Sequence, residues 1–218
     1  VGDVFGHAHV REKGVVLKNH GRFATMSGDV VDAAFAEEDV AGIGRGLAEA
    51  LHAEGNKIII AGRRENVLRE TAAASPGMDF AVLDVENAEA IRSFAAQVVK
   101  DHPALNVLIN NAGIMRAETL TADPVELGDA EAMIATNILG PIRLTAALLP
   151  HLQKQAEATI INVTSGLAFV PLALTPTYSA TKAAMHSYSQ SLRYQLRKTS
   201  VRVIELAPPA VATDLMPS

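Results

Sequence analysis

The stretch Lys57-Ile58-Ile59-Ile60-Ala61 is a short β-branched run without polar alternation. Such a strand is expected to be buried on both faces, as in a parallel sheet that helices cover on both sides. Before it, Ile43, Leu47 and Leu51 recur every four residues and form one apolar stripe, which predicts a helix ending near Gly55. A helix leading into a buried strand is therefore the unit from which the rest of the fold can be worked out.

The same alternation continues along the chain. Short apolar runs predict further buried strands at residues 80–83, 107–109, 159–163 and 201–205. Helical stretches are predicted between and beside them, around residues 64–74, 87–101, 129–153 and 177–197. Strands that alternate with helices indicate right-handed βαβ units. The predicted fold class is α/β, with a doubly wound, Rossmann-like parallel sheet.

Length and composition bound the function. A chain of 218 residues, 49% of them hydrophobic, fits one such domain with a sizeable core. The formal net charge of -5 gives no basic footprint for nucleic acid, and the absence of cysteine excludes disulfides and cysteine-based zinc sites. His7 and His9 alone do not predict a metal site, and none is expected. No apolar run approaches the roughly 18 residues that span a bilayer, so we expect a cytoplasmic protein without nucleic-acid or membrane partners.

The first forty residues do not follow the alternation. We therefore divide the chain into an atypical N-terminal segment, residues 1–40, and the α/β domain, residues 41–218. A Rossmann sheet needs a central first strand, for which Val30-Val31-Asp32-Ala33-Ala34-Phe35 is a poor substitute because it places an aspartate near the core. Our hypothesis is that the region before Ala41 is foreign to the domain.

The strongest chemical signal is Tyr178-Ser179-Ala180-Thr181-Lys182, preceded by Ser165. On a helix, Tyr178 and Lys182 lie on one face about 5–6 Å apart. A neighbouring cation favours the phenolate, which makes Tyr178 a candidate general acid/base. Ser165 follows the strand at 159–163, at the sheet edge where α/β proteins bind ligands, and is a candidate to hold a substrate oxygen. An ordinary helix pair would explain Tyr178 and Lys182 alone, but not their combination with Ser165.

From Gly42 to Thr213 the chain resembles the short-chain dehydrogenases/reductases. The motifs that carry the resemblance are Asn110-Asn111-Ala112-Gly113, Asn137, Asn162-Val163-Thr164-Ser165 and Ala207-Pro208-Pro209-Ala210-Val211-Ala212-Thr213. The central motifs are most similar to bacterial oxidoreductases named after the D-alanylation operon of cell-wall polymers. The resemblance implies a catalytic tetrad of Asn137, Ser165, Tyr178 and Lys182, in which Asn137 holds a water that links the lysine to solvent.

The resemblance also implies a dinucleotide site. Its predicted residues are Gly42, Ile43, Gly44, Arg63, Asp84, Val85, Asn111, Ala112, Gly113, Tyr178, Lys182, Val211 and Thr213. The two glycines at 42 and 44 open a helix, whose free N–H groups suit a pyrophosphate. Where NAD enzymes carry an acid for the ribose 2′-hydroxyl, this chain has Gly62 followed by Arg63 and Arg64. Guanidinium groups suit the 2′-phosphate of NADP, which we favour over NAD, although both arginines would equally suit the start of an exposed helix.

Two departures from the family leave a second function open. Glu37 and Glu38 stand where the family has Thr-Gly, and a carboxylate about 4 Å from one phosphate charge would cost about 4 kcal/mol. Family members also continue well past the Thr213 motif, so we expect a C-terminally incomplete domain. The leading hypothesis is an oxidoreductase that moves a hydride between NADP(H) and a small or medium carbonyl or secondary alcohol. The alternative is a non-catalytic remnant or oligomerisation partner with impaired cofactor binding.

The resemblance finally implies a homodimer or homotetramer, which the helices at 129–153 and 177–197 would form by pairing across a four-helix interface.

Overall fold

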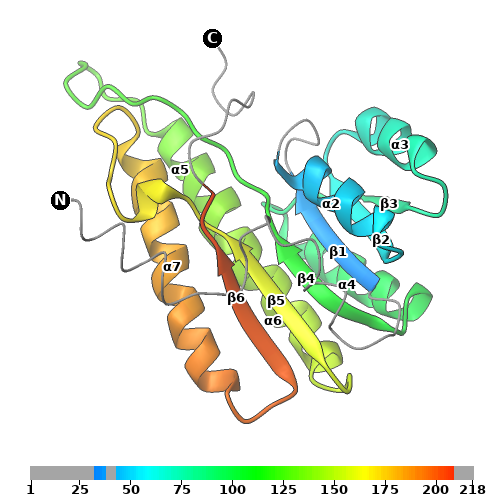
Figure 1. The fold of residues 1–218 in the computed structure, drawn as a ribbon. Helices are drawn as coiled ribbons and strands as arrows, with labels where there is room; N and C mark the ends of the chain where they lie inside the picture. The colour runs from blue at the N-terminus through cyan, green and yellow to red at the C-terminus, as the bar shows by residue number, and fades with distance from the viewer. Residues whose placement is uncertain (1–31, 38–42, 209–218) are drawn as a thin grey trace. The chain divides into compact units, whose positions relative to one another are not determined.

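The sheet has the order expected of a doubly wound α/β domain. In this computed structural model, which describes residues 32–37 and 43–208, six parallel strands lie in the order β3-β2-β1-β4-β5-β6 (Figure 1). The strands are β1 (Asp32–Glu37), β2 (Lys57–Gly62), β3 (Asp79–Val82), β4 (Leu105–Asn110), β5 (Ala158–Val163) and β6 (Val201–Leu206). The direction of winding reverses between β1 and β4, which is where such folds bind their ligands. The predicted fold class is confirmed.

The helices begin and end close to their predicted bounds. They are α2 (Ile43–Ala53), α3 (Glu65–Ala74), α4 (Ala88–Asp101), α5 (Gly128–Ile134), α6 (Gly140–Leu152) and α7 (Pro176–Leu196). The helix predicted over 129–153 differs, because a π turn, η1 (Ala135–Leu139), separates α5 from α6. There the Gly140 N–H bonds to the Ala135 oxygen, five residues back. Such turns often mark functional sites, and the apolar periodicity gave no sign of this one.

Both faces of the sheet are buried, as the unbroken apolar run at 57–61 predicts. Successive side chains of a strand point to opposite faces. On β2, Ile59 and Ala61 belong to one large core with α4, α6 and α7, while Ile58 and Ile60 are buried as well. In Figure 1, α4 and α6 lie behind the sheet and α2 in front of it. The layers therefore hold the carboxyl ends of the strands at one edge, in a fixed geometry.

The central position of the sheet is held by β1. It pairs with β2 from Asp32↔Lys57 to Glu37↔Gly62, and on its other side with β4 from Ala33↔Val107 onward. The segment that we judged a poor substitute thus supplies the missing strand, shifted by two residues. This strand lies within residues 1–40, and residues 38–42, which follow it in the sequence, lie outside the described residues. The foreign origin of the N-terminal segment stays a hypothesis.

One continuous helical stretch, residues 128–152, is long and apolar enough by length and composition to cross a membrane. Its buried residues, among them Met133, Leu144 and Leu148, contribute to the hydrophobic core. A core helix passes the same test, and this packing explains its apolar composition.

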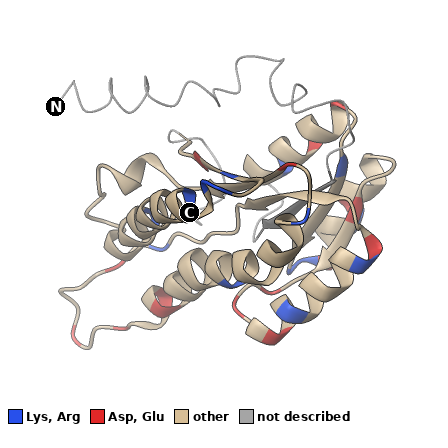
Figure 2. Ribbon diagram, turned by 90° about the horizontal axis from the view of Figure 1, so that it is seen from below, with Lys and Arg blue, Asp and Glu red and all other residues tan. Residues whose placement is uncertain are grey.

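The charged residues of the described helices are interspersed (Figure 2). Several form pairs one turn apart on exposed helix faces, such as Arg45 with Glu49 and Arg69 with Glu65. Pairs of this kind contribute only about 0.3–0.5 kcal/mol each, so the core, not the surface, stabilises the fold.

Gly140, the first residue of α6, permits a close approach that a larger residue would prevent. A Cβ at this position would lie 3.1 Å from both the Cβ and the carbonyl oxygen of Val85. We expect Gly140→Ala to lower the free energy of unfolding by about 1–3 kcal/mol, measured by urea denaturation. The control is Gly46→Ala in α2, where a Cβ meets nothing within 4 Å; it should raise stability by up to about 1 kcal/mol. Equal effects of the two variants would contradict the close approach.

Candidate active site

The predicted site residues gather at the carboxyl edge of the sheet. Arg63 follows β2, Asp84 and Val85 follow β3, the segment 111–113 follows β4, and Ser165 follows β5. Because parallel strands end at the same edge, the topology brings these residues to one side of the domain. Ile43 and Gly44 begin α2, the next described element after β1 in the chain. Three predicted cofactor residues, Gly42, Val211 and Thr213, lie outside the described residues, as do His7, His9 and Glu38.

Tyr178 and Ser165 face each other. Tyr178 lies in the third position of α7, buried at 5% exposure, and its phenol makes a side-chain hydrogen bond with Ser165. The Ser165 oxygen also accepts a bond of 3.1 Å from the Leu167 N–H, which starts the short 3-10 turn η2 (Gly166–Ala168). Ile114 and Met133 pack with Tyr178 in a small apolar cluster. The two hydroxyls are thus held together beside an apolar wall.

Lys182 comes one turn after Tyr178 and is also buried, at 5% exposure. Its Nζ donates a hydrogen bond of 3.0 Å to the Val163 oxygen and lies 5.6 Å from the centre of the Tyr178 ring. A Cβ at Gly113 would come within 3.2 Å of this Nζ. Glycine therefore allows the segment after β4 to lie close to the ammonium group.

The pKa of the phenol is shifted in the direction opposite to our prediction. We expected the ammonium group to lower the pKa of Tyr178. Instead burial raises the pKa of Tyr178 above 10, and the hydrogen bond with Ser165 opposes this rise only in part. The reason is that burial withdraws the phenol from water and so disfavours its charged form. Burial also lowers the pKa of Lys182 from 10.5 to about 8.

Asn137 joins three parts of the site from the middle of the π turn. Its Oδ1 accepts a bond of 2.9 Å from the Ile114 N–H, and its Nδ2 donates to the Ile114 oxygen, also at 2.9 Å. The same Nδ2 donates to Thr181 Oγ1 at 3.1 Å, between Tyr178 and Lys182 on α7. Both amide hydrogens are therefore used, and a water at Asn137, as the family resemblance implies, would have to donate to one of its oxygens.

Two further residues near the site were missed by the sequence analysis. Glu118 accepts bonds from the N–H and the hydroxyl of Thr177, at 2.8 and 2.7 Å. It thereby caps α7, where the N-cap residue Thr175 makes no side-chain cap bond. Glu86 accepts a bond of 2.7 Å from Thr136 and lies 3.9 Å from Arg63. Neither glutamate is near its partner in the sequence, so only the folded chain could reveal them.

At the adenosine end of the predicted site, an arginine side chain lies near a carboxylate. Asp84 Oδ1 accepts a bond from the Glu86 N–H at 2.9 Å, which fixes the turn after β3. Val85 is buried against Gly140. Arg63 is half exposed and near the Glu86 carboxylate. Across residues 32–37 and 43–208, no group of three or more His, Asp or Glu is arranged to hold a metal ion.

The residues at both ends of this edge suit a dinucleotide. The glycine beside Lys182 suits the nicotinamide end, because a Cβ there would crowd the ammonium group, and a guanidinium with a carboxylate neighbour marks the adenosine end. A six-stranded doubly wound sheet with serine, tyrosine and lysine at its switch-point edge defines a Rossmann-type oxidoreductase.

The comparisons with known proteins agree with this class. The family model described as short chain dehydrogenase matches residues 39–218, and the chain belongs to this family of NAD(P)-dependent enzymes. A curated relative, the uncharacterized oxidoreductase DltE of Bacillus subtilis, is 47% identical over 175 residues, which cover 80% of this chain and 69% of the relative. An uncharacterized oxidoreductase of Staphylococcus saprophyticus is 34% identical over 179 residues, covering 80% of this chain and 76% of the relative.

Solved structures share the same fold. The serine dehydrogenase of Escherichia coli is 31% identical, with a TM-score of 0.75 over 81% of this chain and 82% of its own. A closed form of serine dehydrogenase complexed with NADP+ is also 31% identical, with a TM-score of 0.76 over 82% of this chain and 73% of its own. The resemblance on which the sequence analysis drew is thereby confirmed at the level of family and fold.

Burial of Lys182 has a measurable consequence for stability. The pKa of Lys182 is about 8 in the folded chain, against its ordinary value of 10.5, so the unfolded state binds more protons between these values and stability rises with pH across that window. Below pH 8 the burial penalty is fully present and amounts to about 3 kcal/mol at about 1.4 kcal/mol per pKa unit. We expect Lys182→Met to raise the free energy of unfolding at pH 7 by about 2 kcal/mol, after loss of the Val163 hydrogen bond worth about 1 kcal/mol.

The gain should shrink toward zero as the pH approaches 10.5, which denaturant titrations at pH 7 and near pH 10 would measure. The exposed Lys154→Met is the matched control and should change neither value. A Lys182→Met variant that is less stable than the parent chain at both pH values would contradict the burial penalty.

Proposed function

We propose that this chain is an NADP-preferring oxidoreductase that interconverts a small or medium carbonyl compound and the corresponding secondary alcohol. The observation that carries the proposal is the buried Tyr178 phenol, which lies beside the Ser165 side chain and one helical turn from the buried Lys182. Two hydroxyls and a buried ammonium beside an apolar wall are suited to hold a carbonyl oxygen and to pass it a proton.

In the proposed reduction, the carbonyl carbon would receive the hydride that NADPH supplies when it is bound. The Ser165 hydroxyl holds the carbonyl oxygen, and the Tyr178 phenol gives that oxygen its proton, so that the alcohol forms and a phenolate remains. The raised pKa of Tyr178 keeps the phenol protonated at neutral pH, which is the state that proton donation needs. Lys182 stabilises the phenolate by its charge, and Asn137 fixes the segment around Ile114 against α7.

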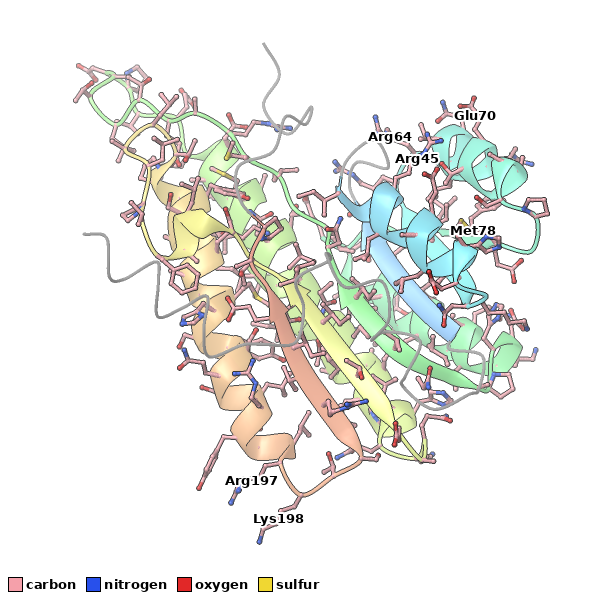
Figure 3. All side chains as sticks on the ribbon, in the orientation of Figure 1. Arg45, Arg64, Glu70, Met78, Arg197 and Lys198 are labelled. Atoms are coloured by element: carbon pink, nitrogen blue, oxygen red, sulfur yellow. The ribbon has the colours of Figure 1, made fainter. Side chains whose placement is uncertain are left out.

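The preference for NADP is supported by the charges at the adenosine end. Arg63 and Arg64 follow β2 directly, and no carboxylate stands at Gly62. In Figure 3, Arg64 and Arg45 lie at the end of the domain where α2 and α3 begin. Arg197 and Lys198, which follow the last residue of α7, lie far from them. Related serine dehydrogenase has been solved with NADP+. Cytoplasmic location and assembly into a homodimer or homotetramer remain part of the proposal.

The substrate face is proposed to be apolar. The segment after Ser165 contributes Phe169, Val170 and Leu172, each at least 40% exposed. Apolar side chains that stay exposed beside polar catalytic groups favour a substrate with a hydrophobic part.

Tyr178→Phe tests the proposed chemistry. With a panel of small aldehydes and ketones, followed by NADPH oxidation, we expect kcat to fall by about 10²- to 10⁴-fold because the proton donor is lost. The dissociation constant of NADPH should change by no more than about twofold, since one hydroxyl is removed without loss of packing. Tyr194→Phe is the control, because Tyr194 is 67% exposed on the same helix, and it should leave kcat unchanged. Turnover that survives in Tyr178→Phe would remove this residue from its role.

The same measurements separate the alternative function. Glu37 ends β1 at the ligand edge, which favours a remnant with impaired cofactor binding. If the enzyme is active, NADPH at 100 times its dissociation constant should stabilise the fold by about 2.7 kcal/mol. Absence of any thermal shift at millimolar NADPH or NADH would favour the remnant.

Arg63→Ala tests the cofactor preference. Loss of a charge-assisted bond to the 2′-phosphate, worth about 1.5–3 kcal/mol, should raise the dissociation constant of NADPH by about tenfold to a hundredfold. The constant for NADH, which lacks that phosphate, should change by less than about threefold on the same grounds. The exposed Arg69→Ala on α3 is the control and should affect neither cofactor. Equal weakening of both cofactors by Arg63→Ala would contradict the assignment.

A further inference from the structure

A carboxylate that the proposed mechanism does not use is buried beside the site. Glu205 lies near the end of β6, and its side chain is only 5% exposed. Along β6 the side chains at positions 201, 203 and 205 share one face, because a strand alternates. The first two are valines packed into the main core with Leu192 and Leu196 of α7. The third, at the level of the active site, is an acid.

Both oxygens of this carboxylate are engaged, each with a different element. Oε1 accepts a bond of 2.7 Å from the Thr164 hydroxyl, and Oε2 lies 2.8 Å from His186 Nδ1. A carboxylate only accepts, so the imidazole carries its proton on Nδ1. Gln190 Nε2 lies 2.6 Å from the other ring nitrogen. The pair of Glu205 and His186 is therefore held by Thr164 at the carboxylate and by Gln190 at the imidazole.

The two partners of Glu205 adjoin the proposed catalytic residues. Thr164 is the residue directly before Ser165, and its N–H bonds to the Leu206 oxygen at 2.8 Å. His186 follows Lys182 by one helical turn on α7. The His186 ring also packs edge-on against Phe169, with 4.8 Å between ring centres. Phe169 is one of the exposed apolar residues in the segment after Ser165. One carboxylate thus connects the strand end that carries the serine with the helix that carries the tyrosine.

Fold stability alone does not explain an acid at this position. A buried carboxylate loses its hydration, and well-packed apolar residues of similar volume are often as stable or more so. The neighbouring inward positions of β6 show that this sheet face accommodates valine. What an apolar residue could not do is hold Thr164 and His186 at fixed hydrogen-bond distances.

We propose that Glu205 is a positioning residue that sets the spacing between Ser165 and Tyr178. It acts through Thr164 on the serine side and through His186 on the tyrosine side. This inference builds on the proposed function, in which Ser165 and Tyr178 hold and protonate the substrate oxygen. It goes further by assigning the geometry of that pair to a residue that touches neither the substrate nor the cofactor.

The test follows the Tyr178 phenol directly, without any substrate. The chain has three tyrosines and no tryptophan, so Tyr188→Phe with Tyr194→Phe leaves Tyr178 as the only source of tyrosinate absorbance. The groups around the phenol are Ser165, whose hydrogen bond lowers the pKa of Tyr178, and Lys182 beside the ring. In this background, ultraviolet titration of the phenol is compared among Thr164→Val, Glu205→Leu and Glu205→Gln, with circular dichroism verifying the fold at each pH.

If Glu205 positions the pair, Thr164→Val and Glu205→Leu weaken the bond from Ser165 and raise the pKa of Tyr178. Loss of the negative charge alone would lower it, so the sign separates positioning from simple electrostatics. Glu205→Gln keeps two polar atoms in place but removes the charge, so it should not raise the pKa of Tyr178 and shows the effect of the charge alone. Thr71→Val is the matched control, because it removes another buried hydroxyl bond, to the Val67 oxygen of α3, and should leave the titration unchanged.

Turnover provides the second measurement. In Thr164→Val and Glu205→Leu we expect kcat to fall about tenfold to a hundredfold, as for a small misplacement of reacting groups, with the dissociation constant of NADPH unchanged. An unchanged or lowered pKa of Tyr178 in folded Thr164→Val overturns the proposal, and that variant decides if Glu205→Leu fails to fold. An inactive parent chain would instead count against the proposed function, while the titration would still report on Glu205.

Discussion

The hydrogen bonds between the buried side-chain amide of Asn137 and the backbone of Ile114 hold the candidate site together. Asn137 meets both the N–H and the oxygen of Ile114, as a neighbouring strand would, and adds a bond to Thr181. Three segments far apart in sequence, the loop after β4, the π turn and α7, are thereby fixed around Tyr178. The π turn makes this possible, because its extra residue changes the direction in which the following side chains leave the helix. Without that change, an ordinary helix over 129–153 would place this amide elsewhere.

A second series of buried polar side chains forms hydrogen bonds between the sheet and the helices α6 and α7. Asn110 on β4 donates to Asn162 on β5 at 2.8 Å and to Thr145 on α6 at 3.1 Å, and Asn162 donates to Ser189 on α7 at 2.9 Å. Buried polar groups are costly when unpaired and specific when paired. Together with the Glu205 pair, they fix the depth and rotation of α6 and α7 on the strands. Apolar contacts alone would permit small slides of these helices.

The sequence predicted the sheet because each strand carries its own signal. The run at 57–61 is apolar at every position, and such runs recur at nearly the observed bounds of β3 to β6. The central strand was harder to predict, since the fragment ending at Phe35 has weak strand propensity and its place depends on β2 and β4 at either side. Ser165, Tyr178 and Lys182 could be predicted from motif and helical spacing. Glu86, Glu118 and Glu205 could not, because their partners come together only in the folded chain.

Burial also explains why the shift in the pKa of Tyr178 differs from the prediction made from spacing. Spacing on a helix indicates which groups are neighbours, but the low dielectric environment disfavours the charged form of both. It raises the pKa of Tyr178 and lowers that of Lys182 to about 8. In water the phenol is slightly the stronger acid of the two, with ordinary pKa values of 10.0 for tyrosine and 10.5 for lysine. In this site burial moves the two pKa values apart, in opposite directions. A solvent-exposed Tyr-x-x-x-Lys pair would show neither shift, so the spacing of the two residues on the helix does not by itself predict their pKa values.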